Sequence, residues 1–278
     1  MNTPPAVRLQ AVGRRFRRGR RAPLRPAEYV DALTDVSLTI PRGARFGVVG
    51  ESGSGKTTLM RLIAALDRPT SGEIEVLGRR ITGRREQQLA FLRRSLQIVF
   101  QDPMSSLDPR MRVGDIVAEP LQVLRRPDVP GSVRRALADV GLDASAARRF
   151  PHQFSGGQRQ RISIARAIAP GPSILIADEA VSALDVTIRA QILALIEDLA
   201  ARQELTLIFV SHDLSVIRRV CDQVAVLRAG HLLETGSTEA IYRNPREQYT
   251  RDLLAAVPTL EKSLAAARAR AAYGRVGE

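Results

Sequence analysis

One glycine-rich stretch of the chain has the residue types and the spacing of a loop that binds phosphate. It fits the pattern G-x-x-x-x-G-K-[ST] without a mismatch. Glycines let the backbone curl until consecutive N–H groups point at one anion. A lysine and a hydroxyl follow at the positions that reach the β- and γ-phosphates and Mg²⁺. The residues are Gly50, Glu51, Ser52, Gly53, Ser54, Gly55, Lys56 and Thr57.

The flanking sequence predicts the strand and the helix that such a loop needs. Arg45–Gly50 is typical of a short buried strand, and apolar residues at helical spacing between Thr58 and Leu66 predict a helix. The start of that helix carries positive potential, so Thr58 joins the residues expected to bind a nucleotide. Lys56 is one of only two lysines among 42 basic residues, which favours a specific role. The other interpretation is a glycine-rich turn that matches the pattern by chance.

Two adjacent acids follow a second apolar strand. Ile174-Leu-Ile-Ala leads into Asp178 and Glu179, and ligands of α/β sheets sit at the carboxyl ends of the strands. Asp178 is suited to holding Mg²⁺. Glu179 could accept a hydrogen bond from an attacking water and polarise it. Alone, the pair could simply cap a strand, but beside a phosphate loop it favours nucleotide hydrolysis.

A third stretch offers a second site for an anion. Phe154-Ser-Gly-Gly-Gln158 opens into an arginine-rich helix, and a glycine-rich helix start presents free N–H groups. The Ser155 hydroxyl and the N–H groups of Gly156 and Gly157 could hold a γ-phosphate. Because the chain already has one complete phosphate loop, this second half-site predicts that two chains share nucleotides in a dimer.

Alternation of strands and helices around these motifs predicts an α/β fold with a parallel sheet. Val7–Val12 and Val36–Ile40 are predicted as antiparallel strands at one edge. Proline and glycine separate helices between Asp102 and about Pro170, which indicates an inserted helical block. The other predicted strands are Glu73–Leu77, Leu96–Phe100, Ser173–Asp178, Leu205–Val210, Gln223–Arg228 and His231–Glu234, and the other helices are Val113–Leu124, Val133–Val140, Gly156–Ala169, Val186–Ala201 and Asp213–Val220.

The composition limits the classes of protein. The 278 residues are 44% apolar, but no apolar stretch reaches the roughly 18 residues of a membrane span. The first residues lack the apolar core of a signal peptide, so a cytosolic protein is expected. The single cysteine, Cys221, excludes an internal disulfide.

The net charge of +13 has two interpretations. It could indicate nucleic acid or an anionic membrane as a partner. The arginines are scattered, which favours a solvated surface and no nucleic-acid partner. The segment from Arg14 to Pro26, with arginines clustered over residues 14–21, is predicted to be an exposed basic loop.

Taken in order, these motifs resemble those of ABC-transporter ATPase subunits over Val7 to Pro258. Three further matches are Gln101 at a strand end, the Ser182-Ala-Leu-Asp185 loop, and His212 after a strand. Phe154 departs mildly, because the family more often has leucine there. The resemblance implies a P-loop NTPase core, an N-terminal antiparallel β subdomain and an inserted α-helical subdomain at about 102–170. The ABC ATPase domain would span 1–258, with 259–278 a frayed or disordered tail.

The resemblance also implies roles for single residues. The catalytic group would comprise Glu179, His212 and Gln101, and Mg²⁺ would be held by Thr57, Gln101 and Asp178. Asp185 would act across the dimer, although it could also be a helix cap. The residues that meet the partner's ATP would be Ser155, Gly156, Gly157 and Gln158.

Two aromatic residues compete for stacking on adenine. Phe16 follows the first strand as the family's aromatic does, and Tyr29 lies beyond the basic segment. A packing role for Phe16 is the alternative to either assignment.

The subfamily resemblance is to ATPase subunits of dipeptide, oligopeptide and nickel importers. It rests on Val99–Arg110, Asp178–Val186 and the run Gln248-Tyr-Thr-Arg-Asp-Leu-Leu. The family's cysteine-rich extension and its iron–sulfur cluster are not expected here. Expected partners are a second ATPase subunit, membrane permeases and an extracytoplasmic substrate-binding protein, with this chain on the cytoplasmic face of the plasma membrane. The alternatives are an ABC ATPase acting on nucleic acid or ribosomes, and a nucleotide sensor without turnover.

Overall fold

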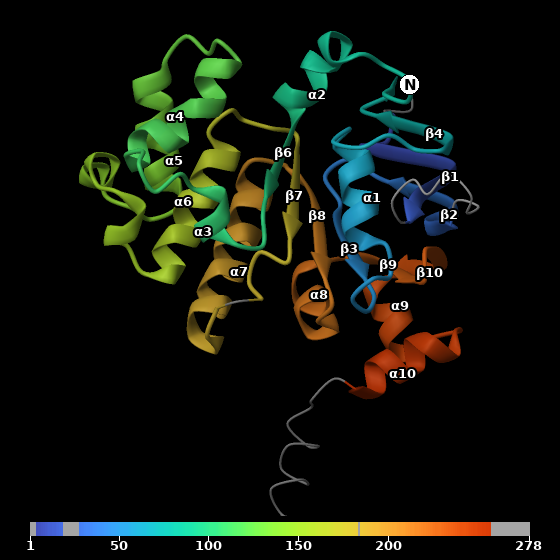
Figure 1. Cartoon of the computed structure of the whole chain (residues 1–278). Helices are drawn as coiled ribbons and strands as arrows, with labels where there is room; N and C mark the ends of the chain where they lie inside the picture. The colour runs from blue at the N-terminus through green and yellow to red at the C-terminus, as the bar shows by residue number, and fades with distance from the viewer. Residues whose placement is uncertain (1–3, 19–27, 183, 257–278) are drawn as a thin grey trace, which may run out of the picture.

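The computed structural model describes residues 4–18, 28–182 and 184–256, and its centre is a six-stranded sheet (Figure 1). The strand order is β10-β9-β3-β8-β7-β6. Neighbouring strands are parallel except for β9 and β10, so the parallel strands end at one edge. The strands are β3 (Arg45–Val49), β6 (Leu96–Val99), β7 (Ile174–Asp178), β8 (Thr206–Ser211), β9 (Gln223–Arg228) and β10 (His231–Ser237).

Alternate residues of the central strands point to opposite faces and build two cores. Ile176 and Ile208 pack on one face, in the core that contains helix α1 (Lys56–Ile63). Leu175 and Phe209 pack on the other face, in the core that contains α7 (Val186–Arg202) and α8 (Leu214–Val220). Burial on both faces explains why these strands are continuous apolar runs in the sequence.

A smaller antiparallel sheet covers α1 from the outside. Its order is β2-β1-β4-β5, and α1 contacts both this sheet and β7. The predicted α/β class with an N-terminal antiparallel sheet is therefore confirmed. The strands are β1 (Val7–Arg18), β2 (Glu28–Ile40), β4 (Ser71–Val76) and β5 (Arg79–Arg80).

The predicted loop from Arg14 to Pro26 is wrong over its first residues. Strand β1 continues through Arg18, and β2 begins at Glu28 instead of Val36. Opposite charges compensate this hairpin, since the Arg14 guanidinium donates to both carboxylate oxygens of Asp67 at 3.0 and 2.8 Å. Charged side chains stand where a strand usually shows alternating apolar residues, and the register between β1 and β2 is irregular. The sequence pattern of a strand is therefore weak here. The rest of the predicted loop, residues 19–27, lies outside the described residues.

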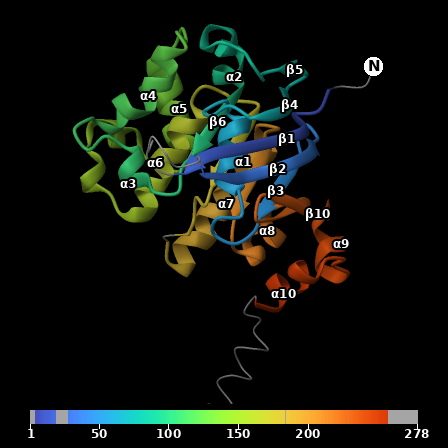
Figure 2. The same cartoon turned by 45° about the vertical axis from the view of Figure 1, so that its right-hand side comes forward.

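Helices inserted between β6 and β7 form a separate block on the left of Figure 1, and Figure 2 shows them beside the sheets from a second side. Helix α5 begins four residues before the predicted Val133, because the Asp128 carboxylate caps the N–H of Gly131 and proline is tolerated in a first turn. The helices are α3 (Pro103–Ser106), α4 (Val113–Val123), α5 (Val129–Asp139) and α6 (Gly156–Ile168), with 3₁₀ turns at Ala144–Arg148 and Pro151–Gln153.

Four short helices have no counterpart among the predicted helices. They are α3, given above, α2 (Ala90–Ser95), which follows a 3₁₀ turn at Glu86–Leu89, α9 (Thr238–Arg243) and α10 (Gln248–Ala256). Helices α2, α3 and α9 have six residues or fewer, which is too few turns for a helical period to be recognised. No helix in the described ranges is long and apolar enough to cross a membrane. The predicted tail, 259–278, lies beyond the described residues.

Candidate functional site

The phosphate loop joins β3 to α1 at the carboxyl edge of the large sheet. The buried Lys56 ammonium donates to the carbonyl oxygens of Gly50 and Glu51, at 2.7 and 2.8 Å. Burial lowers the pKa of Lys56, and the carboxylates of Glu179 and Asp178 act against that shift. The lysine is thus held inside the loop, close to the two acids of the neighbouring motif.

Two glycines of this loop occupy positions that a side chain cannot share. Gly50 has φ of 154°, and a Cβ there would lie 2.2 Å from the carbonyl oxygen of Leu227. Gly55 has φ of 106°, and its Cβ would lie 2.6 Å from the carbonyl oxygen of Ala32. Both the backbone angles and the neighbouring carbonyl groups therefore require glycine.

The acidic pair lies where β7 ends, beside the end of β8. Burial first, and then the charge of Glu179, raises the pKa of Asp178, while Lys56 lowers it. Glu179 has φ of 46°, and its N–H donates to the carbonyl of Val210 at 2.9 Å. Its Oε1 lies 3.1 Å from Nδ1 of His212. The structure thus brings together the acid and the histidine that the sequence places 33 residues apart.

Gln101 lies on the other side of Glu179. Its amide nitrogen donates to the hydroxyl of Ser182 at 3.4 Å, and that hydroxyl donates to the carbonyl oxygen of Glu179 at 3.0 Å. The hydrogen bond leaves the amide oxygen of Gln101 for another partner. The exposed Thr57 hydroxyl, the carboxylate of Asp178 and this amide oxygen are oxygen donors of the kind that suits Mg²⁺. The raised pKa of Asp178 is consistent with a site where a cation would offset crowded negative charge.

The Ser155 segment begins helix α6 and faces outward. The Ser155 hydroxyl accepts from the N–H of Gln158 at 3.3 Å, and the Gln158 side chain accepts from the N–H of Ser155 at 3.0 Å. This capping box leaves Ser155 and Gly156 exposed. Within the described ranges, no hydrogen bond joins this segment to the phosphate loop of the same chain, so the chain offers two separate half-sites.

Gly157 is buried where α6 meets the start of α7. A Cβ at this position would lie 2.5 Å from Cγ2 of Ile188, whereas Gly156 has nothing within 4 Å. Asp185 caps α7, since its carboxylate accepts from the N–H of Ile188 at 2.9 Å. The helix-cap interpretation of Asp185 is therefore observed, and its exposed position leaves a role across a dimer as a proposal.

Phe16 and Tyr29 lie on opposite faces of the β1–β2 hairpin. Phe16 pairs with Val30 in the register, and the next pair joins Arg17 to Tyr29, so their side chains alternate in direction. Each ring is exposed, at 39% and 56%. Only one of them can stack on a base held at this site.

This combination of a phosphate loop, an acidic strand end and an inserted helical block is matched by a known protein family. Residues 33–182 match the family model for the ABC transporter domain. The chain belongs to the ABC transporter family. It is an ABC ATPase with a nucleotide as its ligand.

Similar proteins support this assignment, and their similarity extends over most of the chain. A peptide import ATP-binding protein of Brucella abortus is 51% identical over 231 residues, which cover 82% of this chain and 69% of that protein. The oligopeptide transport ATP-binding protein OppF of Salmonella typhimurium is 42% identical, with 86% and 73% covered. The dipeptide transport ATP-binding protein DppF of Haemophilus influenzae is 44% identical, with 85% and 73% covered.

A solved structure has the same fold as this ABC ATPase. It is the ATP-binding cassette MJ0796 in a dimeric, post-hydrolysis state bound to ADP and Pi, with a TM-score of 0.74 and 29% identity. The similarity covers 84% of this chain and 98% of that one. The fold class predicted from the motif order is confirmed by this likeness.

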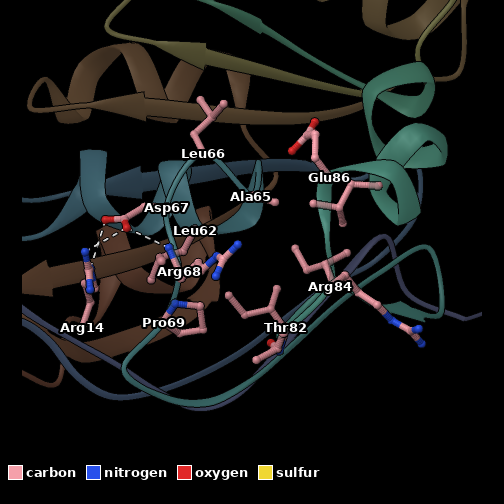
Figure 3. Close-up of a pocket in the computed structure, with 14 residues that line it drawn as sticks. Arg14, Leu62, Ala65, Leu66, Asp67, Arg68, Pro69, Thr82, Arg84 and Glu86 are labelled. Carbon is pink, nitrogen blue, oxygen red and sulfur yellow. Dashed lines mark hydrogen bonds and ion pairs between the residues drawn. The ribbon is translucent and has the colours of Figure 1, made fainter.

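A cavity of about 500 Å³ lies away from the motifs, at the far end of α1 (Figure 3). Figure 3 shows Arg14 and Asp67 joined at its wall. No residue of the phosphate loop lines it. The phosphate loop itself lies at the surface, with Glu51, Ser52 and Gly53 exposed.

Two residues of the site were missed from the sequence. Ser182 bridges Gln101 to Glu179, and the hydroxyl of Tyr249 accepts from the N–H of Glu51 at 3.1 Å. The sequence motifs place Ser182 only in the loop that ends at Asp185, and Tyr249 only in the run that resembles the importer subfamily. Nothing in a sequence shows which distant loop a short helix will contact.

We predict that Gly157→Ala destabilises the ABC ATPase by about 1–3 kcal/mol, because its methyl group would overlap Ile188. Gly156→Ala is the matched control and should change stability by less than about 0.5 kcal/mol, since it meets open space. Urea unfolding followed by circular dichroism measures both. Equal stability of the two variants would contradict the packing described here.

Proposed function

We propose that this ABC ATPase hydrolyses ATP to energise a peptide importer, with nickel or related small cargo as the alternative. The names of three relatives, which describe peptide, oligopeptide and dipeptide transport, support the cargo class. The observation that carries the catalytic part is the contact of Glu179 with His212, 3.1 Å apart at the strand edge that also holds Lys56.

ATP would bind between two subunits. The phosphates would lie on N–H groups of the phosphate loop and of the first turn of α1 other than that of Glu51, which already donates to Tyr249. Lys56 would turn from its two carbonyl partners toward the β- and γ-phosphates. The exposed Ser155–Gln158 segment of a second subunit would cover the γ-phosphate. The likeness to a dimeric cassette bound to ADP and Pi supports this arrangement.

Hydrolysis would depend on Glu179 as the group that orients and polarises the attacking water. His212 would hold the carboxylate of Glu179 and contact the γ-phosphate, which fits its exposure and its hydrogen bond. Gln101 would face the same water, steadied through Ser182. Asp185 would contact the second subunit next to this site. These groups act by position and charge, which is the main contribution of proteins to phosphoryl transfer.

Thr57, Asp178 and Gln101 are the residues that would hold Mg²⁺. When bound, Mg²⁺ supplies positive charge that offsets the negative charge of the β- and γ-phosphates.

Membrane permeases would dock where α2 and β6 meet the helical block. A groove of about 210 Å³ there is lined by Leu66, Phe100 and Arg166, among others. Leu66, Phe100 and Met104 are exposed apolar side chains, at 47%, 41% and 57%, as a docking surface requires. The subunit would thus sit peripherally on the cytoplasmic face of the plasma membrane. A substrate-binding protein outside the cell would deliver the cargo.

We predict that Glu179→Gln keeps ATP affinity within about twofold and lowers turnover by about 100-fold or more, because the amide keeps the shape but cannot act as a base. Lys56→Ala should instead weaken ATP binding by about tenfold or more. Phosphate release and calorimetric ATP titration separate the two effects. Glu239→Gln, the same change on the surface of α9, is the control. Wild-type turnover in Glu179→Gln would remove this residue from its role.

We expect the Glu179→Gln subunit to dimerise with ATP and not with ADP, alone or with the second cassette of its transporter. Adding Ser155→Arg should abolish this dimer, because the side chain would fill the γ-phosphate position. Ser145→Arg is a matched control, since Ser145 is also an exposed serine of the helical block. Sedimentation velocity gives the readout, and a monomer at saturating ATP in every mixture would refute the shared site.

We predict that Phe16→Ala weakens ATP binding by about tenfold, the loss expected for one base–aromatic stack. Binding of inorganic triphosphate should not change, because it has no base. Tyr29→Ala, on the opposite face of the hairpin, should leave both affinities unaltered. The reverse result for the two variants would assign the stacking role to Tyr29.

A further inference from the structure

The C-terminal helix α10 reaches back to the phosphate loop. Tyr249 in its first turn is only 6% exposed, and its hydroxyl accepts the N–H of Glu51 at 3.1 Å. The Arg228 guanidinium covers the ring at 4.7 Å from its centre. A residue almost 200 positions away in sequence therefore bonds to the backbone of the loop.

A buried acid fixes the position of α10. Glu234 of β10 is only 8% exposed. Its two carboxylate oxygens accept the N–H groups of Arg246 and Glu247, at 2.9 and 3.3 Å, just before the helix begins. Hydrogen bonds from backbone N–H to a buried carboxylate are strong and directional. The start of α10, and with it Tyr249, is thus tied to the edge of the large sheet.

The same C-terminal part of the chain holds the loop at a second point. Gly230, in the turn between β9 and β10, donates its N–H to the carbonyl oxygen of Ser54 at 3.0 Å. Two hydrogen bonds from the same part of the chain therefore hold the loop, one between Tyr249 and Glu51 and one between Gly230 and Ser54.

Glu51 has three hydrogen-bond partners: Lys56 and Ser54 within the loop, the latter donating its N–H to the Glu51 carbonyl at 3.2 Å, and Tyr249 outside it. Its carbonyl accepts from the Lys56 ammonium at 2.8 Å, and its N–H is bound by Tyr249. A triphosphate would draw the ammonium away from the carbonyl. The hydrogen bond to Tyr249 would then still tie this residue to a helix outside the loop.

We infer that Tyr249 is a positioning residue for the nucleotide site, and that it keeps the phosphate loop in its binding shape when Lys56 turns to the phosphates. Helix α10 is therefore part of the ATP-binding machinery, although it touches no nucleotide. This inference rests on the proposed function of the loop in binding ATP.

Tyr249→Phe removes only the hydroxyl and tests the inference in the full chain. The KM and the Kd for ATP should rise about fivefold, the factor that one neutral hydrogen bond is worth, and kcat should stay within about twofold. The affinity is measured by calorimetry on the full chain, and KM and kcat by phosphate release from the reconstituted transporter. An unchanged Kd would overturn the inference.

Tyr242→Phe is the matched control. Its hydroxyl donates to the carbonyl of Leu214 in α8, and Arg218 covers its ring at 5.1 Å, so it has the same chemistry without reaching the loop. It should lower the melting temperature and leave the Kd for ATP unaltered. Equal rises in Kd for both variants would mean general loosening, and would overturn a specific role for Tyr249.

Glu234→Gln provides a second, independent variant. The amide keeps one acceptor of two, so the Kd should rise in the same direction as in Tyr249→Phe. Combined with Tyr249→Phe it should add less than the product of the two single effects, because both act through one connection. Full multiplicativity would count against that connection. If Lys56→Ala binds ATP normally, the proposed function itself fails, whereas an inert Tyr249→Phe beside an impaired Lys56→Ala removes only this inference.

Discussion

The buried ammonium of Lys56 is the charge around which the site is arranged. It sits inside a loop whose carbonyl groups of Gly50 and Glu51 bind it, and two carboxylates oppose the loss of its proton. A charge this buried is stable only with partners in place. The loop must therefore curl tightly, which in turn requires glycine where Leu227 and the hairpin approach it.

Parallel pairing is what delivers the other groups to that charge. Strands β3, β7 and β8 run in one direction and end together, so the loop, Glu179 and the segment leading to His212 share one edge. The strands can be this apolar because helices cover both faces. The site is consequently a product of the sheet, although the side chains of Lys56, Asp178 and Glu179 do not belong to its apolar core.

Each chain carries two half-sites that face outward and do not meet within it. In the exposed Ser155 segment, Ser155 and Gln158 cap each other's N–H groups, and other N–H groups at the start of the helix still face outward. Under the proposed function, such a division would make hydrolysis dependent on assembly, and assembly is what a transporter can couple to movement of its membrane subunits. Tyr249 connects α10 to the same phosphate loop through its hydrogen bond to Glu51.

The sequence by itself determined the local chemistry. The shape of a loop such as Gly50–Thr57 depends on residues that are neighbours in the chain, so the residue types predict it. The apolar runs of β7 and β8 likewise predict a buried parallel sheet. Only the tertiary structure decided which distant groups meet. It paired Arg15 with Asp31 across a hairpin that the sequence had indicated as a loop, and it joined Tyr249 to Glu51. Such contacts depend on how whole helices and strands pack, and no local pattern of residues encodes which distant residues will meet.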